Sequence, residues 1–133
     1  MSNTLFVSYR ADTEGNLYKN LLVAWSKNDN GHFDIKFEDA SVGVSLNSTN
    51  ATYIKSVIKK KIESSDTVLV LVGENTSGSD WVNWEIDKAS ELGKKIVAVK
   101  IKSSYTTPAS LYGKGASWAH SFTYASIKKA IDN

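Results

Sequence analysis

The sequence predicts an α/β fold in which a parallel sheet carries helices on both faces. Short apolar segments alternate along the chain with segments whose apolar residues recur at helical spacing. Residues 67–73 begin with one threonine, continue as an uninterrupted run of valine and leucine, and end in a glycine, as expected for a central strand buried on both faces. With 133 residues, the chain has the length of one domain and can bury a core without disulfides or metals.

The other expected strands are shorter or less uniformly apolar. Residues 5–9 form a short apolar strand that ends in polar residues. Residues 33–37 alternate between apolar and polar side chains with period 2, which favours a strand nearer an edge. The fourth strand is expected over residues 95–101, and a short fifth strand over residues 117–122.

Helices are expected between these strands. Apolar residues at helical spacing predict the first two helices: Leu17, Leu21, Leu22 and Trp25, then Ile54, Val57, Ile58 and Ile62. Asn50 is the expected N-cap of the second helix. Ser79 is expected to cap the third helix, with Asp80 in its first turn, where the helix dipole favours an anion. Gly93 suits the end of that helix, and a closing helix is expected over residues 124–131.

Each expected strand and the helix or loop after it form one of five successive units. Right-handed crossovers between the parallel strands arrange these units in a three-layer, flavodoxin-like fold. We expect a five-stranded sheet in the order 2-1-3-4-5, within a single domain spanning residues 1–133. Ligands of such sheets bind beyond the carboxyl ends of the strands. The expected site therefore lies near residues 8–15, 38–50, 73–80 and the segment from Lys102 onward. The long 38–50 segment can act as a lid or a contact arm.

Composition argues against several functions. The chain has no cysteine, which excludes disulfides, zinc–thiolate sites and thiol catalysis. His32 and His120 are far apart in sequence, so neither a histidine-based metal site nor a histidine-based triad is expected, and no cofactor is expected. A net charge of +2 is too small to indicate nucleic acid, and residues 59–61, three lysines, are expected on the solvated face of a helix.

Targeting signals and common catalytic motifs are also missing from the sequence. No stretch approaches the roughly 20 apolar residues that span a bilayer, and the first residues do not form a signal peptide. A cytoplasmic location without membrane contact is therefore expected. The phosphate-binding GxxxxGK[ST], the dinucleotide-binding GxGxxG and the GxSxG nucleophile elbow do not occur.

Several short motifs fall at the expected site. Residues 6–9, Phe-Val-Ser-Tyr, end the first strand, and residues 37–39, Phe-Glu-Asp, end the second. Ser79, Trp81 and Glu85 form an S-x-W-x-x-x-E pattern on the third helix. In this order and spacing the motifs resemble the pattern of TIR domains, most of all the TIR-like proteins of the bacterial Thoeris antiphage system. The resemblance runs from Thr4 to about residue 101.

This resemblance implies an enzyme of antiphage defence that cleaves NAD. Such an enzyme releases nicotinamide and makes a cyclic or conjugated ADP-ribose signal, which a separate effector protein senses. The resemblance also implies self-association with other TIR protomers and a trigger such as a phage protein. NAD is then a substrate and not a cofactor.

Glu85 is the expected catalytic residue. Trp81 and Glu85 are four residues apart and share one helix face, so a carboxylate lies beside a large aromatic ring. Nicotinamide leaves as a neutral molecule and needs no proton, so one carboxylate can stabilise the oxocarbenium charge that develops on the ribose. The alternative for Glu85 is a surface glutamate paired with Lys88. Trp84 is expected to pack or to share the groove with Trp81.

By the same resemblance, Ser8, Tyr9 and Arg10 contact the diphosphate or ribose of NAD. Arg10 suits a phosphate because its guanidinium is planar and permanently charged. An ion pair of Arg10 with Asp12 or Glu38 is the alternative.

Asp39 begins the long loop and either contacts substrate or orders the loop through local hydrogen bonds. TIR domains usually carry a proline or two glycines there and use the loop to contact a neighbouring protomer; this chain has only Gly43. Two other functions stay open: a non-enzymatic TIR scaffold, and an enzyme like a nucleoside deoxyribosyltransferase, which shares the α/β layout and uses a glutamate nucleophile.

Overall fold

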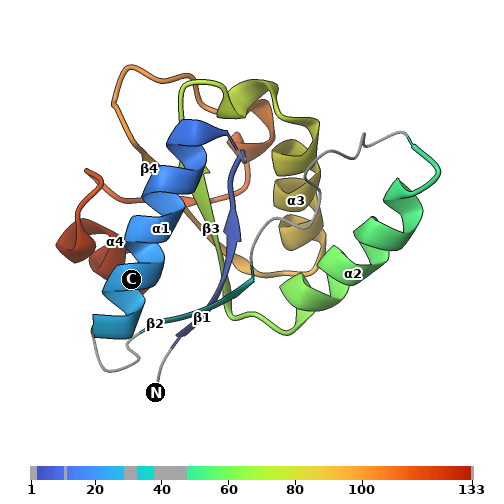
Figure 1. Ribbon diagram of the computed structural model, residues 1–133, viewed down its shortest axis with the longest axis horizontal. Coiled ribbons are helices and arrows are strands. Elements are labelled where there is room, and N and C mark those ends of the chain that lie inside the picture. Colours follow the sequence, from blue (N-terminus) through green and yellow to red (C-terminus); the bar gives the residue numbers. More distant parts are fainter. Residues whose placement is uncertain (1–2, 11, 29–32, 38–47, 133) are drawn as a thin grey trace.

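The computed structural model describes residues 3–10, 12–28, 33–37 and 48–132. Its strands form one parallel sheet in the order β2-β1-β3-β4-β5 (Figure 1). The strands are β1 (Asn3–Ser8), β2 (Phe33–Phe37), β3 (Thr67–Val72), β4 (Lys95–Lys100) and β5 (Ser117–Trp118). The predicted α/β class with a parallel sheet is confirmed.

Helices cover both faces of the sheet, as expected. The four α-helices are α1 (Thr13–Asn28), α2 (Ala51–Glu63), α3 (Asp80–Glu91) and α4 (Tyr124–Asp132), and two short 3-10 helices are η1 (Thr76–Gly78) and η2 (Ala109–Leu111). One core lies between the sheet and helices α2 and α3. The other lies between the sheet and helices α1 and α4.

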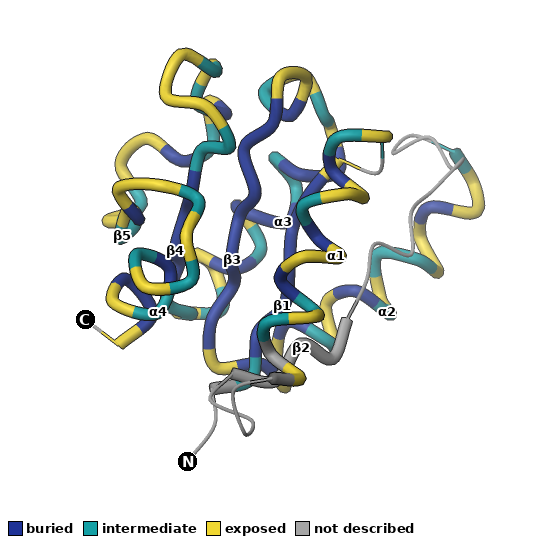
Figure 2. The backbone as a smooth tube through the Cα atoms, turned by 60° about the vertical axis from the view of Figure 1, so that its left-hand side comes forward, coloured by how far each residue is buried: buried dark blue, intermediate teal, exposed yellow. Residues whose placement is uncertain are grey.

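Strand β3 is the centre of both cores, as its uniform apolar run predicted. All six of its residues are buried, and it pairs with β1 on one side and β4 on the other (Figure 2). Val68, Val70 and Val72 face α2 and α3, while Leu69 and Leu71 face α1 and α4. Burying each such side chain is worth about 1.5–3 kcal/mol, so this strand holds the layers together.

The ends of α3 follow the predicted signals. Ser79 Oγ accepts a hydrogen bond from the backbone N–H of Val82 at 3.2 Å, and Asp80 lies in the first turn. Beyond the helix, Gly93 has a φ of +69°, a left-handed conformation that glycine adopts without strain. Both the expected cap and the expected termination are confirmed.

The expected cap of α2 is wrong in its chemistry. Asn50 does occupy the position before the helix, but its side chain makes no capping hydrogen bond. Its backbone is already helical, with φ −72° and ψ −19°, whereas a capping residue has an extended backbone that brings its side chain to the first free N–H groups.

The helix expected from the spacing of Leu17, Leu21, Leu22 and Trp25 is present as α1. Leu22 is fully buried, whereas Leu17 and Leu21 are 58% and 38% exposed. Strand β5 has two residues, because the chain leaves the sheet after Ala119 donates a hydrogen bond to Ala98. Within the part of the chain described, none of the helices combines the length and apolar character needed to cross a membrane.

Candidate active site

Glu85 lies in the middle of α3 and is buried, with 2% of its surface exposed. Its Oε1 accepts a hydrogen bond of 2.7 Å from the hydroxyl of Ser8, the last residue of β1, which is fully buried. The alternative of a surface glutamate paired with Lys88 is therefore wrong; Lys88 pairs instead with Glu91 at 2.9 Å. Ser8 and Glu85, two predicted site residues from motifs far apart in the sequence, are therefore joined by a direct hydrogen bond.

The alternation of β1 determines which of its residues reach Glu85. Phe6 packs in the core beneath α2 and α3, and Ser8, two residues on, points to the same face. Tyr9 faces the other way; it is 4% exposed and packs in the core beneath α1 and α4. The structure therefore does not bring the ring of Tyr9, a predicted substrate contact, to Glu85.

Burying a carboxylate costs free energy, so the burial of Glu85 calls for an explanation other than packing. Removing a carboxylate from water costs several kcal/mol or more unless hydrogen bonds compensate, and a bond to a charged group contributes about 1.5–3 kcal/mol. A well-packed apolar residue at position 85 would avoid that cost. Acidic groups held in this way are characteristic of functional sites, and this one lies beside the carboxyl end of β1, where ligands of parallel sheets bind.

Trp81 and Trp84 differ in their surroundings. Trp81 is 9% exposed and belongs to the core beneath α2 and α3, one helical turn before Glu85. Trp84 is partly buried, and its ring lies 6.0 Å from Lys55 Nζ and 5.6 Å from Lys88 Nζ. The two indoles meet edge to face with centroids 5.9 Å apart. Trp81 can thus form an apolar wall beside Glu85, while Trp84 faces the lysines.

Arg10 extends from the end of β1 toward the loop that follows β3. Its Nη1 donates to the carbonyl oxygen of Asn75 at 3.3 Å, and its Nε lies 3.8 Å from Asp12 Oδ2. The side chain is 47% exposed, and an exposed pair at this distance contributes little to stability. The guanidinium therefore remains accessible to an anion. Glu38 and Asp39 lie outside the described residues.

The turn between β1 and α1 is held by two short hydrogen bonds, one to a side chain and one within the backbone. Asp12 Oδ1 accepts from the N–H of Gly15 at 2.8 Å, and the carbonyl oxygen of Arg10 accepts from the N–H of Asp12 at 2.8 Å. A Cβ atom on Gly15 would lie 1.9 Å from the Arg10 carbonyl oxygen. Only glycine fits at position 15 without a shift of the turn. The turn in this way fixes the position of the Arg10 backbone at the end of β1.

Glu14, in the first turn of α1, connects this helix to two loops at this edge of the sheet, a role that was not predicted from the sequence. Its Oε1 accepts from the backbone N–H of Glu74 at 2.9 Å, and its Oε2 accepts from the hydroxyl of Tyr105 at 2.8 Å. The hydrogen bond to Glu14, with smaller contributions from desolvation and from the charges of Glu14 and Glu74, raises the pKa of Tyr105 to about 12. In sequence, an acidic residue in a first turn indicates only dipole compensation.

Asn83 connects α3 to the segment around η2. Its Nδ2 donates to the carbonyl oxygens of Ser77 and Ser79 at 3.3 and 3.0 Å, and its Oδ1 accepts from the N–H of Ser110 at 3.2 Å. The helix that carries Glu85 is thus tied to the loops on either side of it.

The fold and this site define a three-layer α/β protein with a buried helix carboxylate beside the carboxyl end of β1. A family model described as "Thoeris protein ThsB, TIR-like domain" matches residues 6–106. The chain belongs to this TIR-like family, and the resemblance seen in the sequence is confirmed.

A curated relative from Cytobacillus dafuensis, named "Putative cyclic ADP-D-ribose synthase TIR2", is 37% identical over 49 residues. That match covers 37% of the chain and only 13% of the relative.

Two solved structures share the fold. The CMP N-glycosidase BcmB of Clostridium botulinum has a TM-score of 0.61 at 13% identity, covering 98% of the chain and 99% of that protein. The TIR domains of the activated Roq1 resistosome, which recognises the pathogen effector XopQ, have a TM-score of 0.52 at 20% identity, covering 76% of the chain and 60% of that one. At these identities the likeness concerns the fold alone.

Proposed function

We propose that this protein is an NAD-cleaving enzyme of antiphage defence that makes a cyclic or conjugated ADP-ribose signal. The observation that carries the proposal is the buried hydrogen bond between Ser8 and Glu85 in a chain of the ThsB TIR-like family. The name of the curated relative, a cyclic ADP-D-ribose synthase, supports an ADP-ribosyl product over a short shared segment.

In the proposed reaction, the bond between C1′ of the ribose and the nicotinamide nitrogen breaks. Nicotinamide keeps the electron pair and leaves as a neutral molecule, and positive charge develops on the ribose. The carboxylate of Glu85 stabilises this charge and accepts hydrogen bonds from the ribose hydroxyls. A nucleophile then bonds to C1′ through a lone pair, and a hydroxyl nucleophile releases its proton to water; an atom of the same ADP-ribose gives a cyclic product, and another acceptor gives a conjugate.

Other residues take supporting roles in this proposal. Ser8 holds one carboxylate oxygen of Glu85 in place, and Trp81 supplies an apolar wall beside it. Arg10, exposed at the end of β1, suits the diphosphate of NAD. Asp39 is proposed as a further contact from the loop after β2.

The burial of Glu85 has a consequence for activity. A ribose can reach the carboxylate only if the atoms that cover it move, since 2% of the residue is exposed. We therefore expect the isolated chain to turn over NAD slowly until the site opens. Self-association with other TIR protomers, or a phage protein acting as trigger, would provide that opening in the cytoplasm, and a separate effector would sense the product.

Nucleotide mass spectrometry of infected cells tests this function. Cells with the wild-type protein should accumulate an ADP-ribose derivative and nicotinamide after infection, and cells with Glu85→Gln should not. Glu91→Gln is the matched control, because Glu91 lies on the same helix with its side chain 64% exposed. Equal product in the wild type and Glu85→Gln would overturn the proposal. Defence that persists without any NAD-derived product would favour a non-enzymatic scaffold instead.

A further inference from the structure

A pair of cavities lies at the other side of the sheet from β2, where β4 and β5 end. Their volumes are about 350 and 380 Å³, and Lys100 and Trp118 line both of them. The first cavity also includes His120 and Phe122, and the second includes Tyr112. Trp118 is thus a wall shared by two adjoining hollows.

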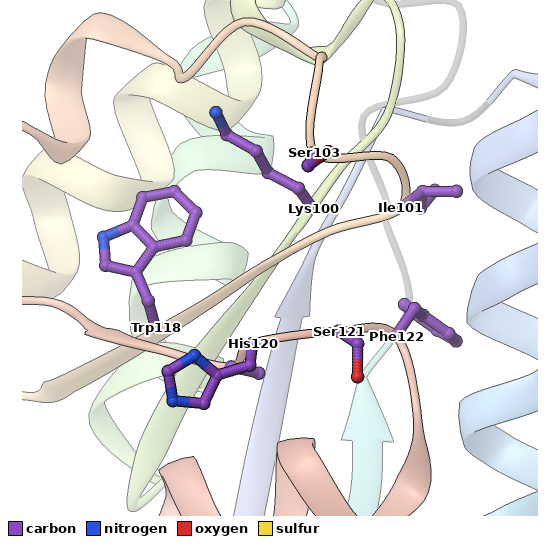
Figure 3. A pocket seen from close by; sticks show the side chains of 8 residues that line it. Lys100, Ile101, Ser103, Trp118, His120, Ser121 and Phe122 are labelled. Atoms are coloured by element: carbon purple, nitrogen blue, oxygen red, sulfur yellow. The ribbon is translucent and has the colours of Figure 1, made fainter.

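The lining of these cavities is both basic and aromatic. Lys100 Nζ lies 5.8 Å from the centre of the Trp118 ring, and 41% of Trp118 is exposed. In the view of Figure 3 the indole lies between the Lys100 ammonium group and the imidazole of His120. Among the described residues that line either cavity, none carries a carboxylate. The lining therefore favours a ligand that is flat and negatively charged.

We propose that this pair of cavities is a binding site for a nucleoside monophosphate. The base stacks on the exposed indole of Trp118, and the phosphate is bound by the ammonium of Lys100. Aromatic side chains bind bases of any sequence through their π faces, and lysine is a common phosphate ligand. The cavity volume is at the lower end for small-molecule sites, which suits one nucleotide unit.

This site is separate from Glu85. The first cavity is lined by Ala119 and Phe122, which pack in the layer of α1 and α4, and the second by Leu111, which packs in the layer of α2 and α3. Glu85 lines neither cavity, and its partner Ser8 is on β1, which β3 separates from β4 in the sheet. Binding here therefore does not require the proposed cleavage of NAD, and the two proposals can fail independently.

Calorimetric titration of the full chain with AMP, adenosine and inorganic phosphate tests the proposal. AMP should bind more tightly than adenosine or phosphate, because only AMP offers both the base and the anion. Added salt should weaken the binding of AMP more than that of adenosine. Equal affinities for AMP and adenosine would overturn the role of Lys100, and no AMP binding at millimolar concentration would overturn the site.

Two variants locate the ligand. Trp118→Leu should weaken AMP binding about tenfold, which is about 1.4 kcal/mol, and Lys100→Ala should weaken it and reduce its salt dependence. The matched controls are Tyr53→Leu and Lys59→Ala, which change exposed residues on α2 and should leave the affinity unchanged.

The position of the bound nucleotide provides a second readout that does not depend on any variant's folding. On addition of AMP, the amide NMR signals of residues 117–122 should shift, while those of α2 should stay in place. Shifts confined to α2, or equal losses of affinity in Trp118→Leu and Tyr53→Leu, would place AMP elsewhere and contradict the proposal.

Discussion

At the scale of single residues, Ser8 and Glu85 form one unit. The hydroxyl of Ser8 is the donor that compensates the burial of the Glu85 carboxylate. Motif spacing identified both residues and made Glu85 the expected catalytic residue, with a surface glutamate as the alternative. The burial of Glu85 was also indicated within α3, because Trp81, Val82, Ile86 and Ala89 define its buried stripe and position 85 lies within that stripe.

Removing the Ser8 hydroxyl should affect both stability and catalysis. Ser8→Ala leaves a buried carboxylate short of a donor, so we expect unfolding free energy to fall by about 1–3 kcal/mol. NAD turnover should also fall, and the double variant with Glu85→Gln should be no slower than Glu85→Gln alone, since the two residues act together. Urea denaturation and nicotinamide release measure the two effects.

Ser65→Ala is the control for this prediction. Ser65 is 2% exposed and donates to the carbonyl oxygen of Lys61 at 2.7 Å, far from the site in sequence. Loss of the Ser65 hydroxyl should lower the free energy of unfolding but should leave the turnover of NAD by the folded protein unchanged. Ser8→Ala protein that is as stable and as active as the wild type would contradict the proposed coupling.

At the scale of elements, the turn between β1 and α1 depends on Gly15. In Gly15→Ala the new methyl group would meet the Arg10 carbonyl oxygen, so the turn must shift. We expect a loss of about 1–3 kcal/mol in unfolding free energy, visible as a lower urea midpoint. Gly78→Ala is the control, because a Cβ there has no atom within 4 Å. Equal stability of the two variants would show that the turn can relax at no cost.

The contacts of Glu14 make a second prediction at this scale. Glu14→Ala removes the acceptor for both Glu74 N–H and the Tyr105 hydroxyl, so α1 loses its connection to the loops after β3 and β4. We expect a loss of about 1–2 kcal/mol and a pKa of Tyr105 closer to its usual value of 10. Denaturation and ultraviolet titration of the tyrosines check this; an unchanged late-titrating tyrosine would contradict the assignment.

At the scale of the whole molecule, the sequence predicted the class and the layers because strand and helix periods differ clearly along the chain. The uniformly apolar run of β3 and the capping signals of α3 contributed most to that prediction of class and layers. Long-range side-chain contacts were not predictable: nothing local to Glu14 indicates Tyr105, 91 residues away. The Trp118 cavities were missed for the same reason, since Lys100 and His120 come from separate segments.

The side to which a residue points was predictable in part. Alternation along β1 places Ser8 and Tyr9 on opposite faces, which a strict period-2 reading of the strand would have shown. The exposure of Leu17 and Leu21 has no such local signal, because helical spacing identifies an apolar stripe but not what covers it.

The central claim is that the Glu85 carboxylate stabilises the transition state of NAD cleavage. The most direct test is the rate of nicotinamide release from NAD by purified, assembled wild-type protein and by Glu85→Gln, with Glu91→Gln as control. Glutamine keeps the shape and can still accept from Ser8, so the fold is retained while the charge is lost. We expect a fall of about 10²–10³-fold or more in Glu85→Gln and no fall in Glu91→Gln. Equal rates in all three proteins would contradict the claim.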